Sequence, residues 1–149
     1  MINDAGRARI QAMDSTLQAF GEQFSKNDAL ASEIGIELLD ISQGYAKAKL
    51  AITEKHLNSF RTVHGGTIFA LADFVFAVAA NSHGTVAVAI NVSISYLKAV
   101  TEGILYAEAK EVSLNPKLGT YSVAVTDEHD NLVATFQGMT YRKKEPVPL

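Results

Sequence analysis

One carboxylate lies alone in the most apolar part of the chain. Between His64 and His83, Asp73 is the only ionisable residue, and the apolar pattern around it predicts a buried helix. Burying an unpaired carboxylate is costly, so such a residue needs a reason. Either Asp73 serves as a nucleophile or general base whose pKa is raised in a partly dry site, or it accepts structural hydrogen bonds from a neighbouring strand or subunit.

Two glycines and a histidine stand at the predicted start of this helix. Gly65 and Gly66 offer bare backbone N–H groups at the positive end of the helix dipole, which suits a developing oxyanion on a thioester carbonyl. Glycine here could equally serve only a tight turn or close packing. Histidine is a common general base in enzymes, but the place of His64 before the helix favours a structural role, fixing the loop by hydrogen bonding.

The helix itself is expected over Gly65–Ser82, with apolar residues on nearly every side. One stripe of the helix consists of Ile68, Leu71, Ala72, Val75, Phe76 and Ala79. Much of the remaining helix surface is covered by Phe69, Phe74 and Val78. A helix of this kind must be covered on two faces. We expect a sheet on one face and a second element or subunit on the other.

Short alternating segments supply that sheet. A hairpin turning at Ser42-Gln43-Gly44 is followed by a polar loop over residues 53–63, and the clearest alternation has Val, Ile or Tyr at every even position from Val86 to Tyr96. The further strands are expected at residues 104–114, 118–127 and 132–142. Together these features predict an α+β fold, a long central helix wrapped by an antiparallel β-sheet.

The two ends of the chain are expected to form a helical segment and an unpaired tail. Residues 14–25 have helical spacing and predict a short amphipathic helix, so residues 1–34 are interpreted as an N-terminal helical segment. Residues 35–149 then form a single domain, and the tail with Pro146 and Pro148 is expected to be frayed.

Composition excludes several classes of function. The 149 residues carry a net charge of −3, which disfavours nucleic acid as a partner. The absence of cysteine excludes disulfides and thiolate chemistry and fits a reducing cytoplasm. No metal is predicted, because the four histidines show no tight ligand spacing with carboxylates. Neither a secretory signal nor a membrane span is evident.

Several of these residues form a pattern that resembles a known family. The spacing of Asn58, Gly65 and Asp73 is specific, and the pattern extends over roughly residues 35–142. It includes the segments His64-Gly65-Gly66, Leu71-Ala72-Asp73, Tyr96-Leu97-Lys98, Leu118-Gly119-Thr120-Tyr121 and Phe136-Gln137-Gly138. In these segments the chain is similar to the hotdog-fold acyl-coenzyme A thioesterases of the phenylacetate-degradation type.

The resemblance implies roles for these residues. The N–H of Gly65 would polarise the thioester carbonyl, Asp73 would attack it or activate a water, and Asn58 would orient the water or the substrate. The two main roles would come from opposite subunits of a homodimer, and two dimers would form a homotetramer. Coenzyme A would be part of the substrate, with no separate cofactor.

Two departures from the family bear on the substrate. Ala89 occupies a position where some relatives carry Ser or Thr. An alanine at this position is more similar to the arylacetyl branch of the family than to the branch that acts on fatty acyl groups. Ala99 replaces a common proline. We therefore expect aryl, arylacetyl or medium-chain acyl groups.

Several basic residues are candidates for the coenzyme A phosphates: Arg61, Lys98, Arg142 and Lys143. A solvated charged tail is an equal interpretation for the run that begins at Arg142. Two other functions stay open: an enoyl-coenzyme A hydratase or dehydratase using Asp73 with His64, and a non-catalytic acyl-coenzyme A-binding protein.

Overall fold

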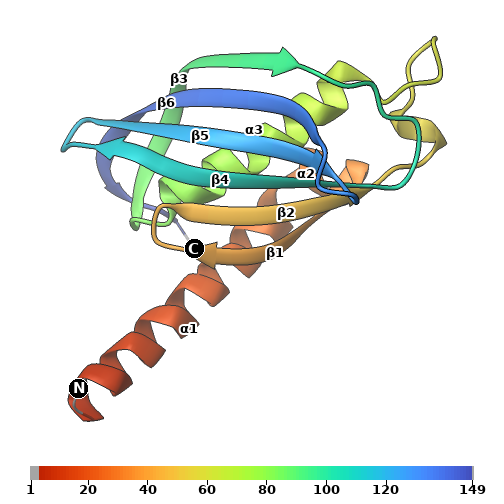
Figure 1. Ribbon diagram of the computed structural model, residues 1–149. Coiled ribbons are helices and arrows are strands. Elements are labelled where there is room, and N and C mark those ends of the chain that lie inside the picture. Colours follow the sequence, from red (N-terminus) through yellow and green to blue (C-terminus); the bar gives the residue numbers. More distant parts are fainter. Residues whose placement is uncertain (1–3, 149) are drawn as a thin grey trace.

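A six-stranded antiparallel sheet curves around one long helix (Figure 1). The computed structural model describes residues 4–148, so the outermost residues of the two predicted segments, 1–3 and 149, lie outside it. The strand order is β1-β2-β4-β5-β6-β3, and the helix is α3, Gly65–Asn81. The strands are β1 Ile36–Ser42, β2 Tyr45–Ala51, β3 Thr85–Tyr96, β4 Ile104–Leu114, β5 Leu118–Asp127 and β6 Leu132–Pro146. The predicted α+β hotdog architecture is confirmed.

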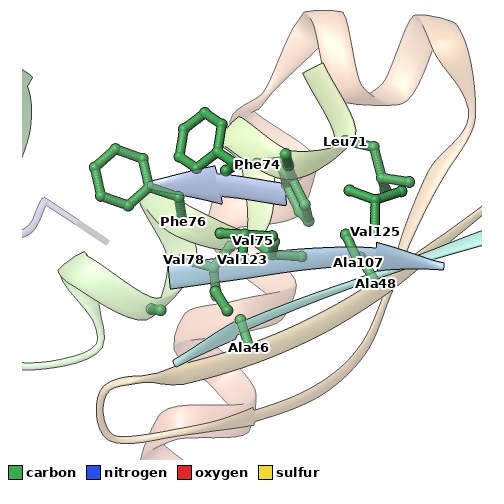
Figure 2. Packing of buried hydrophobic residues seen from close by; sticks show 14 of the residues in the cluster. Ala46, Ala48, Leu71, Phe74, Val75, Phe76, Val78, Ala107, Val123 and Val125 are labelled. Atoms are coloured by element: carbon green, nitrogen blue, oxygen red, sulfur yellow. The ribbon is translucent and has the colours of Figure 1, made fainter. Parts of the chain in front are cut away.

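The helix lies close to the sheet because the strands beneath it carry small side chains. Figure 2 shows Leu71, Val75 and Val78 of α3 packed toward the alanines of β2 and β4. Ala48 and Ala107 are completely buried. Close packing without voids is what makes such a core stable, and here it fixes α3, with Asp73 on it, against the rigid centre of the sheet.

The last strand in the sheet order, β3, has a free edge and a change of register. The pairing with β6 shifts between Ala89 and Asn91, so Ile90 is an extra residue, as in a β-bulge. Before the bulge Ala87 packs on the core, and after it Val92 does. The alternation predicted the strand correctly but not this switch of face. Val88 and Ile90 are left exposed.

The N-terminal region is more helical than predicted. Helix α1 spans Asp4–Asn27 instead of residues 14–25, and a second helix, α2, spans Ala29–Ile34. Only the C-terminal part of α1 packs on the body, through Phe20 and Gly21, and its N-terminal part projects away (Figure 1). Residues 4–13 have no buried face, so their sequence carries no apolar periodicity that would predict a helix.

The predicted loop is present, whereas the expectation for the tail was wrong. The loop predicted at residues 53–63 contains a 3₁₀ turn, Glu54–His56. The tail is not frayed up to its last described residues: β6 continues to Pro146, which pairs with Thr85, and the N–H of Val147 donates to the carbonyl of Gly84 at 3.1 Å. Backbone pairing with β3, which side-chain pattern does not reveal, orders this charged segment.

Candidate active site

The start of α3 presents a backbone N–H group without a partner. His64 is the N-cap, and its Nδ1 accepts a hydrogen bond from the N–H of Gly66 at 2.8 Å. The N–H groups of Thr67 and Ile68 donate to the carbonyl of His64. The N–H of Gly65 has no acceptor among residues 4–148. Helix N-termini with free N–H groups are ready-made sites for negative charge.

Gly65 is held in place by Tyr96, the last residue of β3. The hydroxyl of Tyr96 donates to the carbonyl of Gly65 at 2.9 Å. A Cβ on Gly65 would lie 3.1 Å from the Tyr96 ring, so the absence of a side chain lets the ring approach. Tyr96 is thus a positioning residue. Local sequence could not assign it this role, because it lies 31 positions away from Gly65 in the chain.

Asp73 lies in the middle of α3, partly buried. Burial raises the pKa of its carboxyl group, and the negative charge of Asp28, the N-cap of α2, raises it further. From Ala70 to Asn81, the positions of α3 that stay partly accessible are Ala70, Asp73 and Ala77, at spacings that place them on one helix face. The face that carries Asp73 is therefore the uncovered one.

Gly65 and Asp73 cannot act on the same atom from one protomer. They are eight positions apart on one continuous helix, which places them about 12 Å apart along its axis. The same geometry separates Asp73 from His64, whose Nδ1 is already used by the cap. Within one protomer the structure therefore does not bring together the Asp73 and His64 pair that a hydratase would need.

Asn58 organises the loop before α3. Its side-chain oxygen accepts hydrogen bonds from the N–H of Phe60 at 2.9 Å, and from the N–H and hydroxyl of Thr62 at 3.2 Å each. No residue in the described part of the chain accepts a hydrogen bond from its amide nitrogen. Asn58 thus shapes the loop with its oxygen and has its nitrogen available for a ligand.

The basic candidates fall into two groups at opposite ends of α3. Lys98 lines a hollow with Gly65 near the helix start, and its Nζ contacts Asp127 at 2.6 Å, which holds the pKa of that carboxyl group well below its usual range. Arg61, also near the helix start, pairs with Glu54 at 2.7 Å.

Arg142 and Lys143 lie at the other end of the helix. Arg142 pairs with Ala87 of β3 and donates from Nη1 to the carbonyl of Asn115 at 2.8 Å, while Lys143 is exposed. One protomer therefore does not gather all four predicted phosphate ligands.

Residues 4–148 contain neither a cluster of metal ligands nor a helix that could cross a membrane. In that stretch no three His, Asp or Glu side chains gather closely enough to hold a metal ion. No helix of the described chain combines the length and apolar character needed to cross a membrane.

Comparisons with known proteins give the family context. Residues 60–134 match the model of the thioesterase superfamily. A protein of Archaeoglobus fulgidus, provisionally described as an esterase, is 46% identical over 83% of this chain and 80% of its own. The acyl-coenzyme A thioesterase PaaI of Escherichia coli is 34% identical over 78% of this chain and 84% of its own. The structure of the E. coli PaaI protein superposes with a TM-score of 0.86, covering 90% of this chain and 98% of that one at 29% identity.

Proposed function

The chain belongs to the thioesterase superfamily, and we propose how it hydrolyses acyl-coenzyme A thioesters to the free acid and coenzyme A. The proposal rests on two groups, a hydrogen-bond donor for the thioester oxygen and a carboxylate that can act as nucleophile or base. Gly65 has an unpartnered N–H at a helix start among the described residues, and Asp73 is a partly buried carboxylate with a raised pKa.

In this mechanism the thioester oxygen accepts a hydrogen bond from the N–H of Gly65. Charge that develops on this oxygen is stabilised by that donor and by the positive end of α3. In one route Asp73 attacks the carbonyl carbon, the thiolate of coenzyme A leaves, and water then hydrolyses the anhydride between the acyl group and Asp73 to give the free acid. In the other route Asp73 takes a proton from a water that attacks the carbonyl carbon, the thiolate leaves as the carbon–sulfur bond breaks, and the proton is then released from Asp73. A carboxylate with a raised pKa is a stronger base at neutral pH, because its pKa lies closer to the working pH.

We further propose that two protomers form each site, with Asp73 of one protomer facing Gly65 of the other. The distance between the two groups along α3 supports this arrangement. So does the accessible face around Asp73, together with the free edge of β3, where Val88 and Ile90 are exposed. A strand edge of this length is a template for pairing with another chain.

A homotetramer made from two such dimers is part of the proposal. Val88 is paired with Tyr141 and therefore shares a sheet face with it, as does Met139 two residues earlier. All three are exposed apolar side chains, and such clusters mark interaction surfaces.

Supporting roles follow from position. Asn58 would donate from its amide nitrogen to the water or the substrate, and His64 would hold the loop as the cap of α3. Lys98 and Arg61 would meet phosphates of coenzyme A near the start of the helix, or Arg142 and Lys143 would meet them at its far end. The expected substrates are aryl, arylacetyl or medium-chain acyl thioesters of coenzyme A. No separate cofactor is expected to take part in the reaction. The proposed location of the protein is the cytoplasm.

The reaction is tested by following thiol release from a panel of aryl and aliphatic acyl-coenzyme A esters. We expect turnover by the purified protein and a ranking that identifies the acyl class. A folded protein that hydrolyses no member of the panel would contradict the proposed activity and favour a binding protein.

The oxyanion role is tested by exchanging Gly65 for proline. Proline at the first position of a helix is well tolerated, and the extended backbone of His64, with φ −60° and ψ 134°, suits a residue that precedes proline. Gly65→Pro removes the N–H, whereas the matched control Gly65→Ala adds the same Cβ and keeps it. We expect kcat to fall about 100- to 1000-fold more in the proline variant. Equal losses in both variants would refute the role of the N–H.

The shared site is tested by mixing two inactive variants. Asp73→Asn and Gly65→Pro protomers, unfolded and refolded together, form hybrid dimers in which one of the two sites is intact. Random pairing makes half of the dimers hybrids, so the mixture should regain about a quarter of the wild-type activity. A mixture that stays as inactive as its components would contradict a site made from two protomers.

A further inference from the structure

A buried histidine that the proposed mechanism does not use lies in the loop before α3. His56 ends the 3₁₀ turn Glu54–His56 and is only 2% exposed. Burying an imidazole is costly unless its ring nitrogens have hydrogen-bond partners. Its Nδ1 lies 2.9 Å from the backbone nitrogen of Thr53, and its Nε2 lies 2.7 Å from the carbonyl oxygen of Ile34, the last residue of α2. The ring therefore joins this loop to the end of α2.

The two partners of the His56 ring define where its proton lies. A backbone N–H can only donate, so Nδ1 accepts from Thr53 and carries no proton. A carbonyl oxygen can only accept, so Nε2 carries the proton and donates it to Ile34. The hydroxyl of Thr53, 3.3 Å from Nδ1, can donate to the same nitrogen. Both nitrogens are thus in use, and the ring has one defined neutral tautomer.

The backbone of His56 connects this ring to the proposed oxyanion donor. The N–H of His64 donates to the carbonyl of His56 at 2.8 Å. His64 is the N-cap of α3, and the peptide bond after it carries the N–H of Gly65. The segment between the two histidines closes on itself, since Leu57 pairs with Val63 as an isolated antiparallel bridge. The contact between the ring and α2 therefore fixes the base of the loop from which α3 begins.

The backbone around Gly65 is held on both sides. After the N–H of Gly65, its carbonyl accepts from the hydroxyl of Tyr96. Before that N–H, the N–H of His64 is held by His56. Hydrogen bonds weaken steeply when donor and acceptor are misaligned, and an oxyanion donor is effective because it needs no reorientation during the reaction. The direction of the Gly65 N–H therefore depends on both contacts.

We propose that His56 is a positioning residue, whose contact with Ile34 fixes the loop that aims the N–H of Gly65. The inference rests on the proposed oxyanion role of Gly65 and adds a residue that acts through it. The contact with Ile34 spans 22 positions of sequence, so it ties the loop to another part of the fold. The contact with Thr53 lies within a single turn, which is also closed by the N–H of His56 donating to the carbonyl of Thr53 at 3.0 Å.

Two amide variants separate the contacts of the ring. Asparagine places an oxygen at the position of Nδ1 and no atom at that of Nε2, so His56→Asn keeps an acceptor for Thr53 and loses the donor to Ile34. Glutamine places its amide nitrogen at the position of Nε2, so His56→Gln restores that donor. His83→Asn is the matched control, because it makes the same exchange at the other end of α3, where Nε2 of His83 contacts Glu111.

We expect kcat of His56→Asn to fall about 10- to 100-fold with little change in KM, whereas His56→Gln and His83→Asn stay close to wild type. The effect should vanish in the Gly65→Pro background, which has already lost the N–H that His56 aims. A folded His56→Asn protein with the kcat of wild type would overturn the proposal. An equal loss of kcat in the Gly65→Pro background would also overturn it, because a purely structural role predicts additive effects.

A measurement on the unsubstituted protein tests the proposal even if His56→Asn does not fold. The nitrogen-15 chemical shifts of the His56 ring at neutral pH should show a proton on Nε2 and none on Nδ1. A proton on Nδ1 would overturn the assigned contacts. Failure of the wild type to hydrolyse any ester would contradict the proposed activity itself, and this inference would fall with it. Turnover by the wild type together with an unaffected His56→Asn variant would overturn this inference alone.

Discussion

Replacing Asp73 by asparagine should abolish turnover and at the same time make the protein more stable. The asparagine side chain has nearly the same shape as that of aspartate but no charge and no basic carboxylate. Loss of a nucleophile or general base lowers kcat by about 100- to 10,000-fold. The gain in stability follows from the raised pKa of Asp73, which is due first to burial and then to the charge of Asp28.

The sign of the stability change follows from proton binding. The folded state holds the Asp73 proton to a higher pH than the unfolded chain, so stability falls as the pH rises between the two pKa values. At pH values above both pKa values the cost is fully present, and a tenfold change in proton affinity corresponds to about 1.4 kcal/mol of unfolding free energy. For a domain of this length, each kcal/mol raises Tm by about 2–4 °C.

The assay is thiol release together with thermal unfolding at neutral and acidic pH, at fixed protein concentration. Asp14→Asn, an exposed carboxylate on α1, is the control and should change neither reading. We expect Asp73→Asn to have a higher Tm at neutral pH and the difference to shrink as the pH falls. A variant that is inactive but less stable would mean that Asp73 also accepts structural hydrogen bonds. A variant with intact turnover would refute its chemical role.

Three further outcomes follow from single contacts. Tyr96→Phe should lower kcat up to about tenfold with little change in stability, because it releases the carbonyl at the helix start. The control Tyr106→Phe removes a hydroxyl that has no hydrogen-bond partner among residues 4–148 and should leave kcat unchanged; equal kinetics of the two variants would refute the positioning role. Gly138→Ala should cost about 1–3 kcal/mol of unfolding free energy in urea titration, because its Cβ would lie 2.6 Å from the ring of Phe76; unchanged stability would mean that the ring moves freely. Asp127→Asn should lower Tm at neutral pH, and its Tm should approach that of the wild type in acid. Lys98 lowers the pKa of Asp127 in the folded state, so the charged carboxylate stabilises the fold and this stabilisation is lost as the carboxylate is protonated. A constant difference in Tm at all pH values would contradict this.

Local periodicity was enough to predict α3, the hairpin and the later strands. Each of these elements buries one face or, for α3, nearly all of its surface, and burial leaves its pattern in the sequence. The lone carboxylate and the two glycines at the start of α3 could also be identified, because Asp73 and Gly65 are unusual for their places in an apolar helix.

The remaining features depend on contacts between distant segments. Asp28 influences Asp73 across 45 positions of sequence, and Tyr96 reaches Gly65 across 31. The bulge at Ile90 is set by the pairing of two strands, not by the sequence of one. Helix α1 begins ten residues before its predicted start, at Asp4, because its projecting turns bury nothing and so carry no pattern.

A cavity of about 590 Å³ beside Ala77 and Asn81 of α3 is walled partly by segments that contribute little to the wrapped helix and its sheet. The α1–α2 junction and residues 147–148 line it, yet the core around α3 consists mostly of other residues. Substitutions in peripheral segments are usually tolerated better than those in a close-packed core. During divergence, such a protein could therefore alter the shape of this cavity by changes in these segments, while the helix that carries the reactive groups stays the same.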